Sequence, residues 1–109
     1  MAHLLITSGP TRQHLDPVRF LSNASSGRMG AALAETALAH GHEVTIVSGP
    51  VNIDYPPAAT ILPVISTDEM LASCQRVFPE CDGVIGAAAP CDYRPVRVLA
   101  IDRDGQRRR

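Results

Sequence analysis

The chain has 109 residues, of which 45% are hydrophobic and 19% charged, and its formal net charge is −1. This length suits one domain with one core, and the near-average composition excludes an intrinsically disordered chain. The small net charge provides no field to attract nucleic acid or an anionic membrane, and every apolar run is far shorter than the roughly 18 residues of a membrane span. We therefore expect a cytoplasmic globular protein that binds neither nucleic acid nor membranes.

The first part of the chain has the pattern of a β-α-β unit. The short apolar run His3–Ser8, stopped by Gly-Pro, is typical of a strand buried on both faces of a parallel sheet. The Ala-rich segment 25–40 predicts a helix that Ser25 caps and that ends before Gly41. The β-branched run Glu43–Ser48 predicts the second strand.

The second part repeats this alternation. Ile61–Ile65 is expected to form a third strand, Thr67 to about Phe78 a helix, and Gly83–Ala88 a fourth strand. Alternating strands and helices predict a Rossmann-like, doubly wound α/β domain with a mainly parallel sheet of about four strands. Ligands bind beyond the carboxyl ends of the strands in such sheets, so the site is expected there.

The entrance of the first predicted helix is the first candidate site. Free backbone N–H groups and the helix dipole favour an anion there, and glycines let a phosphate approach closely. We expect Gly9, Ser25, Gly27 and Gly30 to take part. In a simpler interpretation, which the motif supports about equally, Ser25 only caps the helix and Gly30 only packs on the sheet. A dinucleotide fingerprint and a Walker A motif do not fit, because the connection after Gly9 is long and the chain has no lysine.

The connection before this helix adds two polar candidates. Arg19 offers a fixed fork of donors to a phosphate or carboxylate, and Asn23 offers an amide that can donate or accept. An ion pair between Arg19 and Asp16, and a local turn hydrogen bond of Asn23, are the competing interpretations.

The second candidate site follows the fourth predicted strand. Small residues there let a ligand lie on the strand end, and a carboxylate can accept hydrogen bonds from a hydroxyl or amine. The residues concerned are Gly86, Ala87, Ala88, Ala89 and Asp92. Cys91 has no partner base in the sequence and is interpreted as a small filler rather than a nucleophile. The three cysteines and four histidines lack the spacing of metal sites, so no metal ligands are expected.

Three strings of the sequence look familiar together. They are ITSGPTRQHLDPVRFLSNASSGRMG, VTIVSGPVN and GAAAPCDYRP, and they extend from about Leu4 to Pro95. They resemble the phosphopantothenoylcysteine synthetase family, the synthetase half of the bacterial pantothenate-metabolism flavoproteins. The S-N-x-S-S-G-x-M-G pattern is much more specific than a lone glycine motif.

The resemblance implies amide formation in coenzyme A biosynthesis. CTP would activate the carboxylate of 4′-phosphopantothenate as an acyl-cytidylate, and cysteine would then displace the nucleotide monophosphate. Asn23 and Arg19 match catalytic residues at the acyl intermediate. The positions that match nucleotide contacts are Gly9, Ser25, Gly27, Gly30, Gly86, Ala87, Ala88 and Asp92, and those that match substrate contacts are Asn23, Ala88, Ala89 and Asp92. Mg²⁺ is expected to arrive with the nucleotide, and FMN is not expected.

The sequence departs from the family after Pro95. Members continue into a lysine-rich segment that neutralises the triphosphate, and then into strands that complete the site and a homodimer. This chain has Asp102 near the position of that lysine. We therefore expect a nucleotide-binding α/β domain at residues 1–95, truncated relative to the family, and a tail at 96–109 whose native or frame-shifted origin is open, as is dimerisation.

Two alternatives to a ligase-type enzyme follow. The first is a non-catalytic nucleotide-binding fragment that keeps the phosphate loop but lacks the lysine segment. The second is a short-chain reductase, suggested by Tyr93-x-x-x-Arg97 but disfavoured because that chemistry normally uses lysine and a different glycine spacing.

Overall fold

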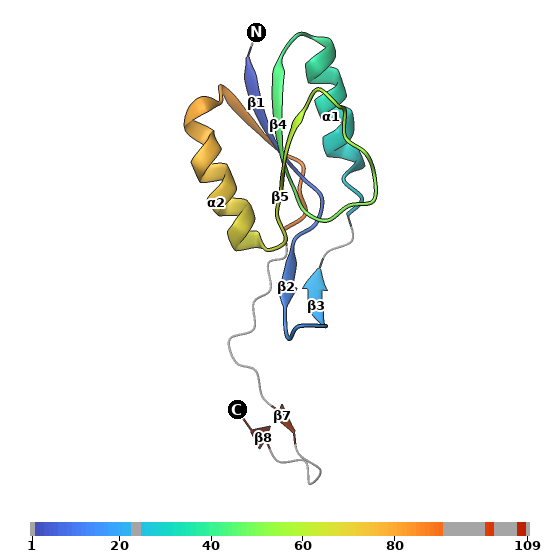
Figure 1. Ribbon diagram of the computed structural model, residues 1–109, viewed down its shortest axis with the longest axis vertical. Coiled ribbons are helices and arrows are strands. Elements are labelled where there is room, and N and C mark those ends of the chain that lie inside the picture. Colours follow the sequence, from blue (N-terminus) through green and yellow to red (C-terminus); the bar gives the residue numbers. More distant parts are fainter. Residues whose placement is uncertain (1, 23–24, 91–99, 102–106, 109) are drawn as a thin grey trace.

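The fold is a parallel sheet with a helix on each face. The computed structural model describes residues 2–22, 25–90, 100–101 and 107–108. The sheet has the strand order β5-β4-β1-β6, and helices α1 and α2 lie on its opposite sides (Figure 1). The elements are β1 (His3–Ser8), α1 (Arg28–Ala39), β4 (Glu43–Ser48), β5 (Thr60–Pro63), α2 (Thr67–Val77) and β6 (Gly83–Gly86). The predicted doubly wound α/β class is confirmed.

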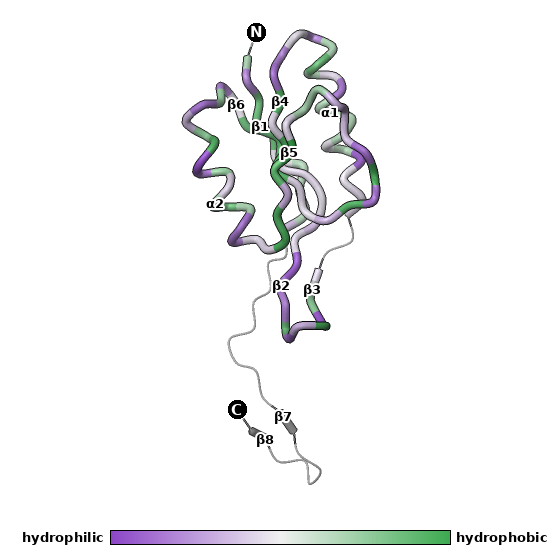
Figure 2. Tube along the Cα trace, in the orientation of Figure 1, coloured by the Kyte–Doolittle hydropathy of each residue, from purple (hydrophilic) through white to green (hydrophobic). Residues whose placement is uncertain are grey.

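Strand β1 contributes to the core on both faces of the sheet, because successive side chains of a strand point to opposite sides. Ile6 is fully buried in a cluster with Ala34 and Ala37 of α1, and Leu5 is fully buried in a cluster with Met70 of α2. In Figure 2 the hydrophobic colouring gathers on the central strands, whereas both helices alternate between hydrophobic and hydrophilic residues. The continuous apolar run at His3–Ser8 thus reflects burial on two sides.

The entrance of α1 differs from the prediction. The N-cap residue is Gly27, in the left-handed conformation with φ of 78°, and it makes no side-chain cap bond. Ser25 therefore does not cap the helix, because the helical backbone begins only at Arg28; instead Ser26 Oγ lies 3.4 Å from the Arg28 N–H. The predicted helix end is confirmed, with Gly41 at φ of 86° just beyond it.

Helix α2 begins with a complete capping box. Ser66 Oγ accepts from the Glu69 N–H at 3.1 Å, and Glu69 Oε1 accepts from the Ser66 N–H at 3.1 Å. Each residue thereby satisfies a backbone donor that the helix start leaves unpaired. After Val77 the chain tightens into a short 3-10 turn, Phe78–Glu80, as expected where Pro79 cannot continue the helix.

A β-hairpin, for which the sequence pattern predicted no strands, occupies the long connection between Gly9 and α1. Strands β2 (Arg12–His14) and β3 (Phe20–Ser22) pair antiparallel and extend beyond the carboxyl end of β1 (Figure 1). Its turn is organised by Asp16, whose Oδ1 accepts from the N–H groups of Val18 at 2.9 Å and Arg19 at 2.7 Å. The Arg19 Nε donates to Asp16 Oδ2 at 2.8 Å.

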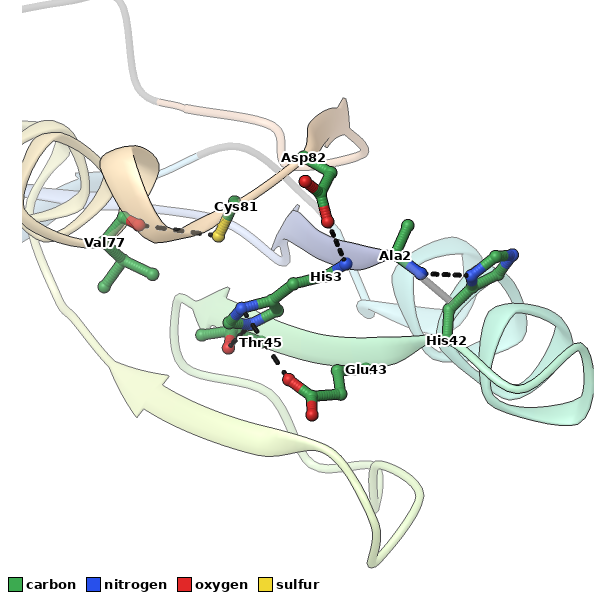
Figure 3. A network of polar contacts seen from close by, with 8 residues as sticks. All are labelled: Ala2, His3, His42, Glu43, Thr45, Val77, Cys81 and Asp82. Atoms are coloured by element: carbon green, nitrogen blue, oxygen red, sulfur yellow. Dashed lines mark hydrogen bonds and ion pairs between the residues drawn. The ribbon is translucent and has the colours of Figure 1, made fainter.

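The opposite, amino end of the sheet is closed by polar contacts (Figure 3). The His3 N–H donates to Asp82 Oδ2 at 2.7 Å, and His3 Nε2 lies 2.7 Å from Thr45 Oγ1. The Ala2 N–H donates to His42 Nδ1 at 3.0 Å. These contacts fasten the start of β1 to both neighbouring strands, so this end of the sheet has a structural role.

Two further observations concern the rest of the chain. Within the predicted tail 96–109, the described residues form the short antiparallel pair β7 (Ala100–Ile101) and β8 (Arg107–Arg108). Neither helix in the described part of the chain has the length and apolarity that a membrane crossing requires.

The acidic turn of the hairpin should show its hydrogen bonds in an acid titration. The N–H groups of Arg19 and Val18, followed by the Arg19 guanidinium, lower the pKa of Asp16 from 3.8 to about 2. Because the folded pKa is lowered, the stabilisation of the turn is present above pH 3.8 and is lost as the pH falls through about 2. The amide shifts of Val18 and Arg19, followed by NMR, should titrate with a midpoint near 2, and Asp16→Asn should abolish this titration. A midpoint at the ordinary carboxyl value would rule out these bonds.

Gly30 allows α1 to pack closely on β1. A Cβ atom built at Gly30 would overlap Ser8 Oγ, and Ser8 is fully buried. Alanine normally stabilises a helix by about 1 kcal/mol over glycine, but Gly30→Ala should destabilise the protein by about 1–3 kcal/mol through overpacking. Urea unfolding measures the difference. The neighbouring Met29→Ala, at a side chain that is 69% exposed, should change the free energy of unfolding by less than about 0.5 kcal/mol; a stabilised Gly30→Ala variant would contradict the packing.

Candidate functional site

The candidate site lies at the carboxyl ends of the parallel strands. From β1 the chain passes outward to β4 and then to β5. It returns to β6 on the other side of β1, so the direction of the strand order reverses at β1. Such a reversal is where doubly wound sheets bind ligands. The entrance of α1 and the hairpin β2–β3 meet at this end of the sheet.

A polar cavity of about 450 Å³ opens there. It is lined by Arg12 of β2, by Ser25, Ser26 and Arg28 at the start of α1, and by the segment 50–53 that follows β4. The lining therefore includes two arginines, two serines and the start of a helix. All of these groups favour an anion with several oxygens, such as a phosphate chain.

Arg12 is held in place by its neighbours. Its guanidinium carbon lies 4.3 Å from the centroid of the Phe20 ring, a cation–π contact across the hairpin. The Arg12 N–H donates to the Ile65 carbonyl at 2.6 Å, which ties the hairpin to the connection between β5 and α2. The hairpin thus fixes the position of Arg12, a residue of the cavity lining.

The glycines of the first candidate site, at the entrance of α1, are required by packing. Gly9 and Gly27 have positive φ, and a Cβ at either would crowd Val51 Cγ1, at 2.8 and 3.0 Å. Gly30 packs on Ser8, as described above. These positions bring the segment after β4 against the helix entrance, and of the four residues predicted for the nucleotide in this loop, Ser25 lines the cavity.

The second predicted cluster lies on the other side of β1. The Ala87 N–H donates to the Thr7 carbonyl at 3.0 Å, and the Ala89 N–H donates to the Gly9 carbonyl at 2.9 Å. The segment 86–89 therefore continues the pairing of β6 with β1 past the strand end. Gly86 is exposed, Ala87 to Ala89 are half-buried, and none of them lines the polar cavity.

Three other predicted residues remain, and of these Arg19 lies among the described residues. Arg19 lies in the hairpin turn, paired with Asp16, and its side chain is 81% exposed, outside the cavity lining. This is the ion pair that competed with a catalytic role for Arg19. Asn23 and Asp92 lie outside the described residues, as does Cys91.

The predicted set omitted Arg12, Ser26, Arg28 and the segment 50–53. A signal for the arginines was available, since both stand inside the long string that carries the family resemblance. The contribution of residues 50–53 depends on the packing of Val51 against two distant glycines, which no local pattern reveals.

A second cavity, of about 400 Å³, lies between α2 and β6. Its lining is mainly apolar and includes Leu5, Phe78 and Val84, so it offers no group that would hold a phosphate. Burial raises the pKa of the nearby Cys74 thiol, and burial together with Glu80 and Asp82 raises that of Cys81. These thiols therefore stay protonated and are poor nucleophiles.

Comparisons with known proteins agree with the sequence motifs. The chain is 45% identical over 98 residues to the coenzyme A biosynthesis bifunctional protein CoaBC of Bacillus subtilis (strain 168), covering 89% of this chain and 24% of that protein. The chain thus spans about a quarter of the length of this curated relative.

Solved structures share the fold. A crystal structure of the C-terminal domain of coenzyme A biosynthesis bifunctional protein CoaBC has a TM-score of 0.83 and 46% identity, covering 89% of this chain and 49% of that chain. A Cab2 mutant in complex with phosphopantothenate-cysteine has a TM-score of 0.77 at 21% identity, covering 97% of this chain and 54% of that one, which supports the fold alone. A protein-family model described as the DNA/pantothenate metabolism flavoprotein C-terminal domain matches residues 1–104. The chain therefore belongs to the family of DNA/pantothenate metabolism flavoprotein C-terminal domains.

Proposed function

We propose that this chain belongs to a ligase domain of coenzyme A biosynthesis that joins 4′-phosphopantothenate to cysteine with CTP. The family membership and the similarity to CoaBC proteins support this proposal. The single structural observation that carries it is the polar cavity at the entrance of α1, with Arg12 and Arg28 in its lining.

The proposed reaction has two steps. A carboxylate oxygen of 4′-phosphopantothenate attacks the α-phosphorus of CTP, which forms the acyl-cytidylate and releases pyrophosphate. The amine of cysteine then attacks the acyl carbon, the acyl–oxygen bond breaks, CMP leaves, and the amine loses a proton. Negative charge builds on phosphate oxygens in the first step, so fixed cations and N–H donors lower its barrier.

The cavity residues take defined roles in this proposal. Arg12 and Arg28 bind phosphate oxygens of CTP, with the hydroxyls of Ser25 and Ser26 beside them. Arg19 and Asn23 act at the acyl intermediate, and the 81% exposure of Arg19 lets a bound phosphate ester compete with Asp16 for its guanidinium. Gly86 to Ala89, on the other side of β1, contact the nucleotide and the pantothenate, and the family resemblance assigns Asp92 to the same contacts.

Mg²⁺ is proposed to enter with the triphosphate. The described residues include no group of three or more His, Cys, Asp or Glu side chains suited to a metal ion. The described lining of the cavity likewise consists of arginines, hydroxyls and the segment 50–53, without a carboxylate. The phosphates of CTP would supply the oxygen ligands that Mg²⁺ prefers.

The two cavity arginines should determine CTP affinity. Arg12→Ala or Arg28→Ala should each weaken CTP binding about tenfold or more, because a hydrogen bond to a charged group contributes about 1.5–3 kcal/mol. Isothermal titration calorimetry of the whole chain with CTP measures this change. Arg76→Ala removes an exposed arginine of α2 that does not line the cavity and is the matched control, with unchanged affinity. Equal affinity in all variants would refute the placement of the phosphates.

Turnover separates ligation from simple nucleotide binding. Pyrophosphate release is followed with CTP, Mg²⁺ and 4′-phosphopantothenate, with and without cysteine. Release that depends on 4′-phosphopantothenate supports the ligase-type reaction in this chain. CTP binding without release supports the alternative, a non-catalytic nucleotide-binding fragment, and an absence of CTP binding refutes both.

A further inference from the structure

Three hydroxyl groups, two of them on buried residues and one on a half-buried residue, lie together beneath the entrance of α1. They belong to Ser8 at the end of β1, Ser48 at the end of β4, and Tyr55 in the connection between β4 and β5. The Tyr55 hydroxyl lies 2.9 Å from Ser8 Oγ and 2.7 Å from Ser48 Oγ. Ser8 is fully buried and Ser48 is 3% exposed, so the hydroxyls of these two serines depend on protein partners rather than water.

Proton counting gives this cluster a direction. Each hydroxyl has one proton to donate. Ser8 Oγ donates to the Gly27 carbonyl at 3.3 Å, so its oxygen accepts from Tyr55. The Tyr55 proton is then used on Ser8, and Ser48 Oγ donates its own proton to the Gly49 carbonyl at 2.8 Å, so Ser48 stands beside Tyr55 at 2.7 Å without driving the chain of donors. The relay runs from Tyr55 through Ser8 to Gly27.

The end of the relay is the N-cap of α1. The Gly27 carbonyl also accepts from the Ala31 N–H at 3.0 Å, which is the first hydrogen bond of the helix. A Cβ atom at Gly27 would lie 2.9 Å from the Tyr55 hydroxyl oxygen, so Tyr55 stands directly against this residue. Gly27 immediately precedes Arg28, which lines the polar cavity.

We infer that Tyr55 is a positioning residue for the phosphate groups of the nucleotide, acting through Ser8 on Gly27. This inference rests on the proposed function. The relay fixes the orientation of the peptide at Gly27 and hence of the N–H groups and the arginine that begin α1. It also holds the connection after β4 against the helix. The start of α1 and the segment 50–53, which both line the cavity, therefore depend on the same hydrogen bonds.

The variant Tyr55→Phe isolates the hydroxyl. The ring of Tyr55 packs against the cluster on the α1 side of the sheet, and phenylalanine keeps that ring. CTP should bind the variant about three- to tenfold more weakly, as expected when one buried hydrogen bond is lost. Cytidine, which lacks phosphates, should bind with unchanged affinity. A merely structural defect would lower the affinities for CTP and cytidine by the same factor.

A double-mutant cycle tests the path of the effect. Ser8→Ala breaks the contact with Gly27 and should weaken CTP binding by a similar factor, and adding Tyr55→Phe should then weaken it no further. Thr36→Val is the control, because it removes a hydroxyl of α1 that does not line the cavity. This hydroxyl donates to the Ala32 carbonyl at 3.0 Å. This control should leave CTP binding unchanged. Additive losses in the double variant would overturn action through Ser8.

Hydrogen exchange tests the relay without a ligand. In Tyr55→Phe the Ala31 amide should exchange faster, while the His40 amide at the far end of α1 should keep its rate. Unchanged exchange at Ala31 overturns the relay, whatever the binding data. If wild type binds CTP and Tyr55→Phe binds it equally well, the positioning role is overturned while the proposed function stands. If wild type binds no CTP, the proposed function fails together with the ligand part of this inference, and hydrogen exchange still decides whether the relay exists.

Discussion

The close approach of α1 to the carboxyl end of β1 determines the geometry of this end of the molecule. Ser8 occupies the space that a side chain at residue 30 would need, and the missing Cβ of Gly30 lets the helix lie directly over the strand end. The free N–H groups of the first helical turn are thereby brought to the edge where parallel strands end. Had α1 stood further away, its positive end would not lie beside the connection after β4.

The same approach buries polar groups that need hydrogen-bond partners, and the hydroxyls of Ser8 and Tyr55 provide them. Packing a helix start on a strand end buries Gly27 and the hydroxyls of Ser8 and Ser48, and unpaired buried polar groups cost about 1–3 kcal/mol each. No buried side-chain oxygen or nitrogen among the described residues lacks a partner. The two ends of the sheet thus differ in kind: contacts around His3 and Asp82 close the amino end, whereas the carboxyl end pairs its polar groups beneath an open, cationic cavity.

Local sequence patterns predicted the parts of the fold that are determined locally. The strands His3–Ser8 and Glu43–Ser48 were predicted with their observed bounds, since continuous apolar or β-branched runs ended by Gly-Pro leave little ambiguity. The hairpin β2–β3 was missed because it lacks alternating polarity, and its stability depends on Asp16 and on the contact of Arg12 with Phe20. The serine cap was wrong because Gly27 adopts a left-handed conformation that propensity alone does not reveal. The cavity residues of β2 and of the segment 50–53 come together only through tertiary packing.

The position of β1 explains why the proposed contacts fall into two groups. Its end is flanked by the segment 50–53 on the β4 side and by the segment 86–89 on the β6 side, and α1 begins above it. A reaction that joins a nucleotide phosphate to a second substrate needs two ligands whose reacting atoms meet. Under the proposed function, the phosphates occupy the cationic cavity and the second substrate approaches along the small residues after β6. The reacting phosphorus would then lie near the end of β1. There the hydrogen bond from Ser8 fixes the Gly27 peptide and with it the direction of the N–H groups that begin α1. The orientation of this one peptide group would therefore determine how accurately the two substrates are aligned.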